Sequence, residues 1–268
     1  MRITPNLIKI RFSVLPPTDC INKWFAERNV FFLLGIGRSG TRFLAELLNT
    51  DKNAIVFHEP IPEDFDAFCI AYKNEKAAFR YISKYRKKKM YSLVKGVDVK
   101  TYGEVNSVLR YHVEAIIKCF PHARTLHLVR DGRDVVRSFM SREHYDKGSK
   151  GHHALRPVKR DPLYYRWGTL SRFEKICWLW ADANRRVRQH ANRYVKFEKV
   201  ISDYTYFQEN IENYLEVDIG REKWIAAVNR PKNTSKHFII PHWKEWDERL
   251  AESFERICGD EMRMFGYL

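Results

Sequence analysis

Residues 30–42 read Val-Phe-Phe-Leu-Leu-Gly-Ile-Gly-Arg-Ser-Gly-Thr-Arg and indicate the fold more clearly than any other segment. The apolar half of this segment predicts a buried strand, and the glycines that follow predict a tight turn leading into a helix. Such a turn presents backbone N–H groups and the positive end of a helix dipole, which together bind phosphate. The residues predicted to contact the anion are Gly37, Arg38, Ser39, Gly40, Thr41 and Arg42.

The end of this loop argues against a metal-bound triphosphate. A nucleoside triphosphatase has G-x-x-x-x-G-K-[ST], in which the lysine contacts the phosphates and the hydroxyl binds Mg²⁺. Gly35 and Gly40 have that spacing, but Thr41 and Arg42 follow, and the cation is Arg38, inside the loop. We therefore predict a phosphate site without a metal. A P-loop kinase is the alternative enzyme, and it would need the missing lysine and Mg²⁺ ligands.

A second segment repeats the pattern of strand, turn and helix. Residues 125–142 read Thr-Leu-His-Leu-Val-Arg-Asp-Gly-Arg-Asp-Val-Val-Arg-Ser-Phe-Met-Ser-Arg. Arg130 follows the apolar strand directly, and Ser138 lies about two turns into the predicted helix. Taken alone, Arg130 is equally well explained by a surface ion pair with Asp131 or Asp134. In open α/β sheets, ligands bind at the carboxyl ends of the strands. Two such units with cationic turns suggest one ligand with two separated phosphates.

Together the two segments resemble the sulfotransferases that use 3′-phosphoadenosine 5′-phosphosulfate (PAPS) as donor. Residues 35–41 resemble the family's 5′-phosphosulfate loop. Residues 128–138 resemble its 3′-phosphate motif, in which Arg130 and Ser138 would hold that phosphate. The resemblance runs from about residue 30 to the C-terminus and is closest to carbohydrate and tyrosylprotein sulfotransferases. It implies sulfuryl transfer to a hydroxyl acceptor, with a carbohydrate favoured over a phenol, adenosine 3′,5′-bisphosphate as product and no metal.

The strand at 54–58 leads to two candidate bases, His58 and Glu59, at the edge where the phosphate loop lies. Adjacent strand residues point to opposite faces, so we expect one of the two to enter the cleft. Pro60 predicts an extended conformation for Glu59. Related carbohydrate and tyrosylprotein sulfotransferases carry a glutamate in this position. The resemblance therefore favours Glu59 as the base and leaves His58 as the alternative.

A strand predicted at 91–99 would end at Lys100. The family often has a lysine at the matching place, which implies that Lys100 contacts the sulfonate and stabilises the transition state together with Arg38. Lys95 is the local rival for this role. The family also closes a late loop over the nucleotide, and residues 230–236 are a weak match, with Ser235 and Lys236 as candidates.

Strands alternating with helices predict a three-layer α/β/α fold of the P-loop type, with a central parallel sheet flanked by helices. Residues 143–168 lack periodicity, and we interpret them as an acceptor-binding lid. The predicted strands are 30–36, 54–58, 91–99, 124–130 and 193–197, and the predicted helices include 40–49, 104–119, 132–142 and 171–191.

The chain of 268 residues suits one α/β domain over 29–268, preceded by an irregular extension over 1–28 that contains Pro5, Pro16 and Pro17. We find no leader pattern and no apolar run long enough to span a membrane. The five cysteines are widely spaced, which favours reduced thiols and no metal site. These features predict a cytoplasmic protein; they leave its oligomeric state open.

The net charge of +15 and a pI near 9.6 favour anionic partners, including PAPS and acidic glycans. The densest cluster, residues 84–89, lies at the end of a predicted helix, where cations also complement the helix dipole on a solvated face. A non-catalytic nucleic-acid-binding protein is the alternative from another class. It predicts salt-sensitive DNA or RNA binding and has no need of the Arg130 and Ser138 pair.

Overall fold

The computed structural model describes residues 16–230 and 238–268, so the candidates Ser235 and Lys236 lie outside the described residues. One parallel sheet forms its centre, with the strand order β2-β3-β1-β4-β5. The strands are β1 (Asn29–Gly35), β2 (Ala54–His58), β3 (Thr101–Asn106), β4 (Arg124–Val129) and β5 (Arg193–Lys196).

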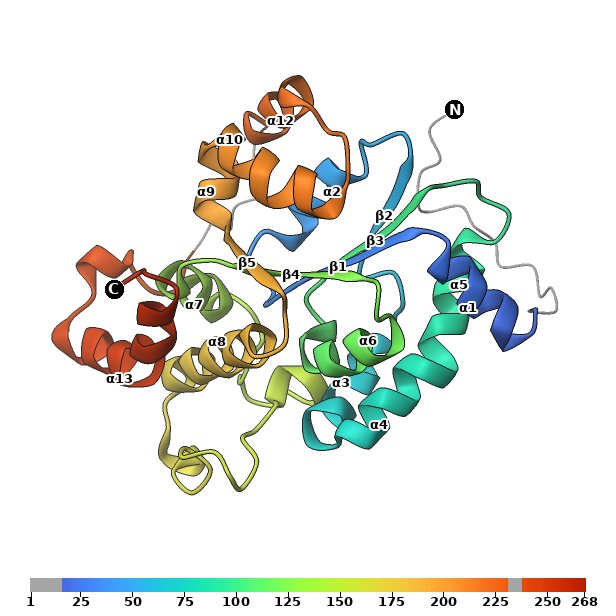
Figure 1. Cartoon of the computed structure of the whole chain (residues 1–268). Helices are drawn as coiled ribbons and strands as arrows, with labels where there is room; N and C mark the ends of the chain where they lie inside the picture. Colours follow the sequence, from blue (N-terminus) through green and yellow to red (C-terminus); the bar gives the residue numbers. More distant parts are fainter. Residues whose placement is uncertain (1–15, 231–237) are drawn as a thin grey trace.

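Helices cover both faces of the sheet (Figure 1). One face carries α2 (Thr41–Leu48), α9 (Phe197–Ser202), α10 (Tyr204–Phe207), α11 (Asn213–Leu215) and α12 (Arg221–Val228). The other layer contains α1 (Thr18–Ala26), α3 (Asp64–Lys73), α4 (Glu75–Arg80), α5 (Lys87–Val94), α6 (Val113–Cys119), α7 (Gly132–Met140) and α8 (Arg172–Arg188), with α13 (Glu248–Met264) outside α8. The predicted three-layer α/β/α fold with a parallel sheet is confirmed.

The alternation of side chains along β1 divides the apolar core in two. Phe31 and Leu33 pack with α2 and α9–α12, whereas Phe32 and Leu34 pack with the opposite helical layer. All four side chains are fully buried. A central strand covered on both faces reads as a continuous apolar run, which explains why residues 30–34 gave so clear a prediction.

The third strand differs from its prediction. Residues Lys87–Val94 belong to α5, and β3 is Thr101–Asn106, so the predicted strand at 91–99 is wrong. The predicted helix at 104–119 is likewise reduced to a 3₁₀ turn at Leu109–Tyr111 and to α6. The hydrophobic pattern did not reveal β3, because this strand buries the polar residues Thr101, Glu104 and Asn106 in the middle of the sheet.

A buried ion network makes the charge in β3 tolerable. Arg86 donates bidentate hydrogen bonds to Asp64 (2.8 and 2.9 Å) and to Glu104 (3.1 and 2.6 Å). All three side chains are almost completely buried. Buried charges persist only when they are paired in this way, so Glu104 could enter the sheet only with Arg86 beside it.

The N-terminal region is more ordered than predicted. Residues Thr18–Ala26 form α1, whose Ile21 and Phe25 are buried in the core against the sheet. Their burial stabilises this helix. The nearby prolines had argued against a helix here, but Pro17 lies at the N-cap, where proline is tolerated. Within 16–230 and 238–268, no helix combines the length and apolarity needed to cross a membrane.

Candidate active site

The loop after β1 forms the predicted strand–turn–helix cradle at the carboxyl edge of the sheet. Two of its residues have left-handed backbone conformations, Arg38 with φ 70° and Gly40 with φ 93°. Gly40 has no alternative, since a Cβ there would lie 2.1 Å from the ring of Phe197. A left-handed arginine is uncommon and costs free energy, and such strain concentrates at functional sites.

The two motifs identified in the sequence meet in space. Arg38 Nε donates a hydrogen bond to Ser138 Oγ at 2.8 Å, and Arg130 Nη1 donates to the carbonyl oxygen of Arg38 at 3.1 Å. Because β1 and β4 are neighbouring parallel strands, the loops that follow them share one edge of the sheet. Arg38, Arg130 and Ser138 therefore form one cationic cluster.

Buried polar atoms in this cluster have unused hydrogen-bonding capacity. Among the described residues, Ser39 Oγ and Arg130 Nε are buried without a hydrogen-bond partner. Buried polar groups are nearly always satisfied, so these two need an explanation such as a bound ligand. An anion that accepts several hydrogen bonds fits a donor set of hydroxyls, guanidinium groups and a helix N-terminus.

Positive charge is concentrated around Arg38. Burial, and then the neighbouring charges of Arg142 and Arg130, hold the pKa of its guanidinium below the ordinary value. Arg130 pairs with Asp134 at 3.4 Å, whereas Arg38 and Arg142 form no ion pair among the described residues. A bound anion would therefore relieve the repulsion around Arg38. Arg142, at the C-terminal side of α7, was missed in the sequence because nothing in its spacing marks it as facing the loop.

The two candidate bases converge instead of diverging. His58 Nε2 lies 3.1 Å from Thr41 Oγ1 and 3.8 Å from Glu59 Oε1. The side chains of His58 and Glu59 are each 19% exposed. The prediction of an extended Glu59 on the opposite face from His58 was wrong. β2 ends at His58, and Glu59 takes a left-handed conformation with φ 48°, so strand alternation no longer applies.

Ser107 holds the carboxylate of Glu59. The Ser107 backbone N–H donates to Glu59 Oε1 at 3.2 Å, and the Ser107 hydroxyl donates to the same oxygen. Ser107 follows β3 directly, at the same edge of the sheet as the phosphate loop. It was missed because the strand had been predicted some ten residues too early; a polar residue directly after a correctly placed β3 would have been the signal.

The surroundings of His58 favour the neutral form of its imidazole. Burial lowers the pKa of the imidazole, and Arg42 adds to this, whereas Glu59 and Glu46 act in the opposite direction. The described residues contain no ion pair between Glu59 and either Arg38 or Arg42. Both His58 and Glu59 are thus available beside the loop as proton acceptors.

Lys100 lies at the wrong end of its strand for the role that the resemblance implied. It precedes β3, where its N–H bonds the carbonyl of Asn53 and its carbonyl accepts from the N–H of Asn29. This is the amino edge of the sheet, opposite the phosphate loop, and the Lys100 side chain is exposed there. The predicted contact of Lys100 with a sulfonate is therefore excluded by the register of β3.

A hollow of about 530 Å³ opens beside Arg38. It is lined by Arg38 and Phe139 on one side and by residues of the segment predicted as a lid, among them His144 and His153. The His144 and His153 rings lie 4.5 Å apart between centroids. Within the part of the chain that the structure describes, no group of three or more His, Cys, Asp or Glu side chains is placed to hold a metal ion.

Solved structures with the same arrangement of elements identify the fold. Sulfotransferase STF9 from Mycobacterium avium matches with a TM-score of 0.51 and 15% identity, over 89% of this chain and 77% of that one. A sulfotransferase from Alicyclobacillus acidocaldarius matches with a TM-score of 0.50 and 16% identity, over 88% of this chain and 93% of that one. This chain has the sulfotransferase fold.

The sulfotransferase fold is shared here without recognisable overall sequence similarity. No protein-family model matches the chain, and no curated protein matches it. At such low identity the likeness concerns the backbone arrangement alone. The function must be argued from the side chains that the sulfotransferase fold carries at the carboxyl edge of its sheet.

Proposed function

We propose that this protein is a PAPS-dependent sulfotransferase that transfers the sulfuryl group to a hydroxyl of a carbohydrate. The observation that carries the proposal is the hydrogen bond between Arg38 and Ser138, which joins the two motifs at one point. In the proposed complex, the loop Gly37–Arg42 holds the 5′-phosphosulfate, and Arg130 and Ser138 hold the 3′-phosphate. The unpartnered Ser39 Oγ and Arg130 Nε supply further donors.

In the proposed reaction, Glu59 accepts the proton of the acceptor hydroxyl while the acceptor oxygen forms its bond to sulfur. The bond between sulfur and the 5′-phosphate oxygen breaks, and adenosine 3′,5′-bisphosphate leaves. Ser107 fixes the Glu59 carboxylate in one orientation, which a general base needs. Arg38 stabilises the charge that develops on the leaving phosphate, and a preorganised cation of this kind is typically a large catalytic contribution.

His58 is the second candidate for the base. Its contact with Thr41 Oγ1 joins it to the phosphate loop, and its neutral imidazole can accept a proton. Glu59 is preferred because its carboxylate is oriented by Ser107 from the neighbouring strand β3. The acceptor would enter through the hollow beside Arg38, where Phe139 and His144 provide an apolar and a polar wall.

Binding of adenosine 3′,5′-bisphosphate, measured by calorimetry beside AMP, ADP and ATP with Mg²⁺, tests the proposal. We expect the 3′,5′-bisphosphate to bind most tightly, and transfer from labelled PAPS to be unaffected by EDTA. Equal or tighter binding of ATP with Mg²⁺, or a strict requirement for a metal, would contradict the proposal in favour of a P-loop kinase.

A further inference from the structure

A straight row of cations lies on the outer helical layer. Lys76, Arg80, Lys84 and Lys88 follow one another at intervals of four residues through α4, a π-helical segment (Tyr81–Arg86) and α5, and all four are exposed. We call these four residues the cation row. A second series with the same interval faces the core and is buried, and its members are Ala78, Ile82, Arg86 and Met90.

The π-helical segment explains why the row stays straight. In a continuous α-helix, residues four apart rotate by about 40° per step, so a row of four would wind around the helix. The π-helix has i→i+5 hydrogen bonds and turns less per residue, which offsets this drift. The buried series confirms the geometry, because Ala78 and Met90 both still face the core. The cation row therefore spans roughly 18 Å on the face opposite the core.

The row is electrostatically uncompensated. None of its four members forms an ion pair within residues 16–230 and 238–268. The sequence between Glu75 and Asp98 contains no acidic residue. Like charges four residues apart destabilise a helix, so an unbroken row is unfavourable unless a polyanion binds it.

Other cations of the same sequence cluster are already used in packing. Lys87 donates to the carbonyl of Cys119 at 3.2 Å and lies over the ring of Phe120, and Lys89 pairs with Glu63. The cluster at 84–89 thus divides into structural cations and members of the cation row. The row is the part whose charge no packing interaction uses.

The shape of the surface favours a linear polymer over a membrane. The apolar side of these helices is committed to the core, so it is not available for insertion into a bilayer, as an interfacial helix requires. The side chains that flank the row include Phe79 and Tyr85, which are 44% and 61% exposed. Aromatic rings between cations suit the apolar faces of sugar rings, as they also suit nucleic-acid bases.

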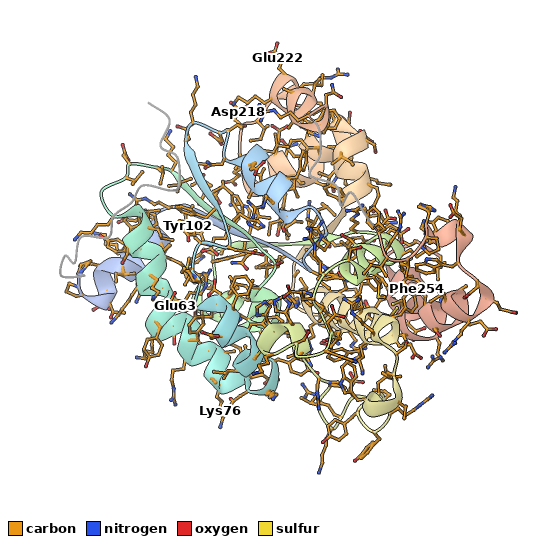
Figure 2. All side chains as sticks on the ribbon, turned by 180° about the vertical axis from the view of Figure 1, so that it is seen from behind. Glu63, Lys76, Tyr102, Asp218, Glu222 and Phe254 are labelled. Carbon is orange, nitrogen blue, oxygen red and sulfur yellow. The ribbon has the colours of Figure 1, made fainter. Side chains whose placement is uncertain are left out.

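The C-terminal end of the row lies near the segment that follows β2. Glu63, which follows Glu59 by four residues, pairs with Lys89, the neighbour of Lys88 in the row. Figure 2 shows Glu63 and Lys76 on the same helical layer, with Lys76 at the edge of the molecule. We infer that the cation row binds a linear anionic polysaccharide, as the part of the acceptor chain that extends beyond the hydroxyl to be sulfated. This inference rests on the proposed function.

The test compares two variants that remove the same charge. The row variant replaces each member of the cation row with glutamine. The control variant replaces four exposed cations that lie outside both the row and the segment 143–168, namely Lys52, Lys199, Arg221 and Arg249. The probe is a labelled polyglucuronate oligosaccharide, followed by fluorescence anisotropy at roughly 50 and 200 mM salt, the range over which counterion release is evident. Circular dichroism melting checks folding, which loss of like charges should not impair.

We expect the row variant to bind the polyglucuronate roughly tenfold more weakly or worse. Its binding should also depend less steeply on salt, because fewer cations contact the polyanion and fewer counterions are released. The control variant should lose much less affinity for the polyglucuronate. The same oligosaccharide with its carboxylates reduced to alcohols should not bind.

Equal losses in the two variants would overturn the inference, since net charge alone would then explain binding. Tighter binding of single-stranded DNA of equal charge through the row would also overturn it, in favour of nucleic acid. The proposed function fails separately: its failure would appear as absent binding of adenosine 3′,5′-bisphosphate to the wild-type protein. The row variant should bind that nucleotide normally.

Discussion

Arg38, in the loop after β1, donates a hydrogen bond of 2.8 Å from its Nε to Oγ of Ser138 on α7. The backbone carbonyl of the same arginine accepts from Arg130 at the end of β4. Residues that are far apart in the sequence thus share one set of hydrogen bonds at the edge of the sheet. Binding at either predicted phosphate site should therefore depend on both loops.

Replacing Arg130 with alanine tests the 3′-phosphate site. We expect adenosine 3′,5′-bisphosphate to bind roughly 10- to 100-fold more weakly, because a hydrogen bond to a charged group contributes about 1.5–3 kcal/mol. AMP should be affected less, through the lost bond to the Arg38 carbonyl alone. Ser138→Ala is the matched variant, since it removes only a hydroxyl. Equal losses for both nucleotides, measured by calorimetry, would refute the 3′-phosphate assignment.

Glu59→Gln should reduce the turnover of PAPS and acceptor by about 10²- to 10⁴-fold, the usual contribution of a general base. Glutamine has the same shape and can still accept the hydrogen bond from the Ser107 N–H, so nucleotide affinity should not change. Steady-state kinetics beside calorimetry separate the two effects. If His58→Gln removed activity and Glu59→Gln did not, the base would be His58.

Acid should destabilise the fold through buried histidines. Burial lowers the pKa of His112 and of His127 to about 4, against an ordinary value of 6.5. The unfolded chain then binds more protons between pH 6.5 and 4, so stability is complete above pH 6.5 and falls as the pH drops toward 4. The loss is at most about 1.4 kcal/mol per pH unit for each histidine.

Urea unfolding at a series of pH values measures this effect. His127 is fully buried in β4 and bonds Asn184 at 2.9 Å. His127→Gln keeps a polar side chain there but cannot titrate, so its stability should fall less steeply with acid than that of the wild type. A pH dependence that is identical in the two proteins would show that His127 does not contribute.

Arg86→Ala should destabilise the protein by about 3–5 kcal/mol, because it leaves the carboxylates of Asp64 and Glu104 buried without their cation. Chemical denaturation at neutral pH measures the loss. A triple variant that combines Arg86→Met with Asp64→Asn and Glu104→Gln should recover much of it, since no charge then stays buried unpaired. No recovery would indicate that the shape of the network matters more than its charge.

The sequence predicted the parts of this protein in which local pattern and tertiary environment agree. β1 has a continuous run of buried apolar residues and β4 ends in the buried Leu128 and Val129, and each strand is followed by a turn that carries the cations the sequence placed there. β3 failed because Glu104 is a charged residue inside the sheet, and only Arg86 from a distant helix makes that possible. Because β3 was predicted too early, Lys100 was wrongly assigned to the carboxyl edge of the sheet, and Ser107, which lies there, was not recognised.

From the sequence alone we could predict the alternation of strands and helices and the glycine-rich turn over Gly37–Arg42. These follow from local rules, since glycine conformation and apolar periodicity act over a few residues. The three-dimensional structure was needed to show that His58 and Glu59 converge, that Ser107 holds Glu59, and that Arg142 adds its charge to Arg38. Those contacts join separate loops, and their geometry depends on strand register and backbone strain, which no short segment encodes.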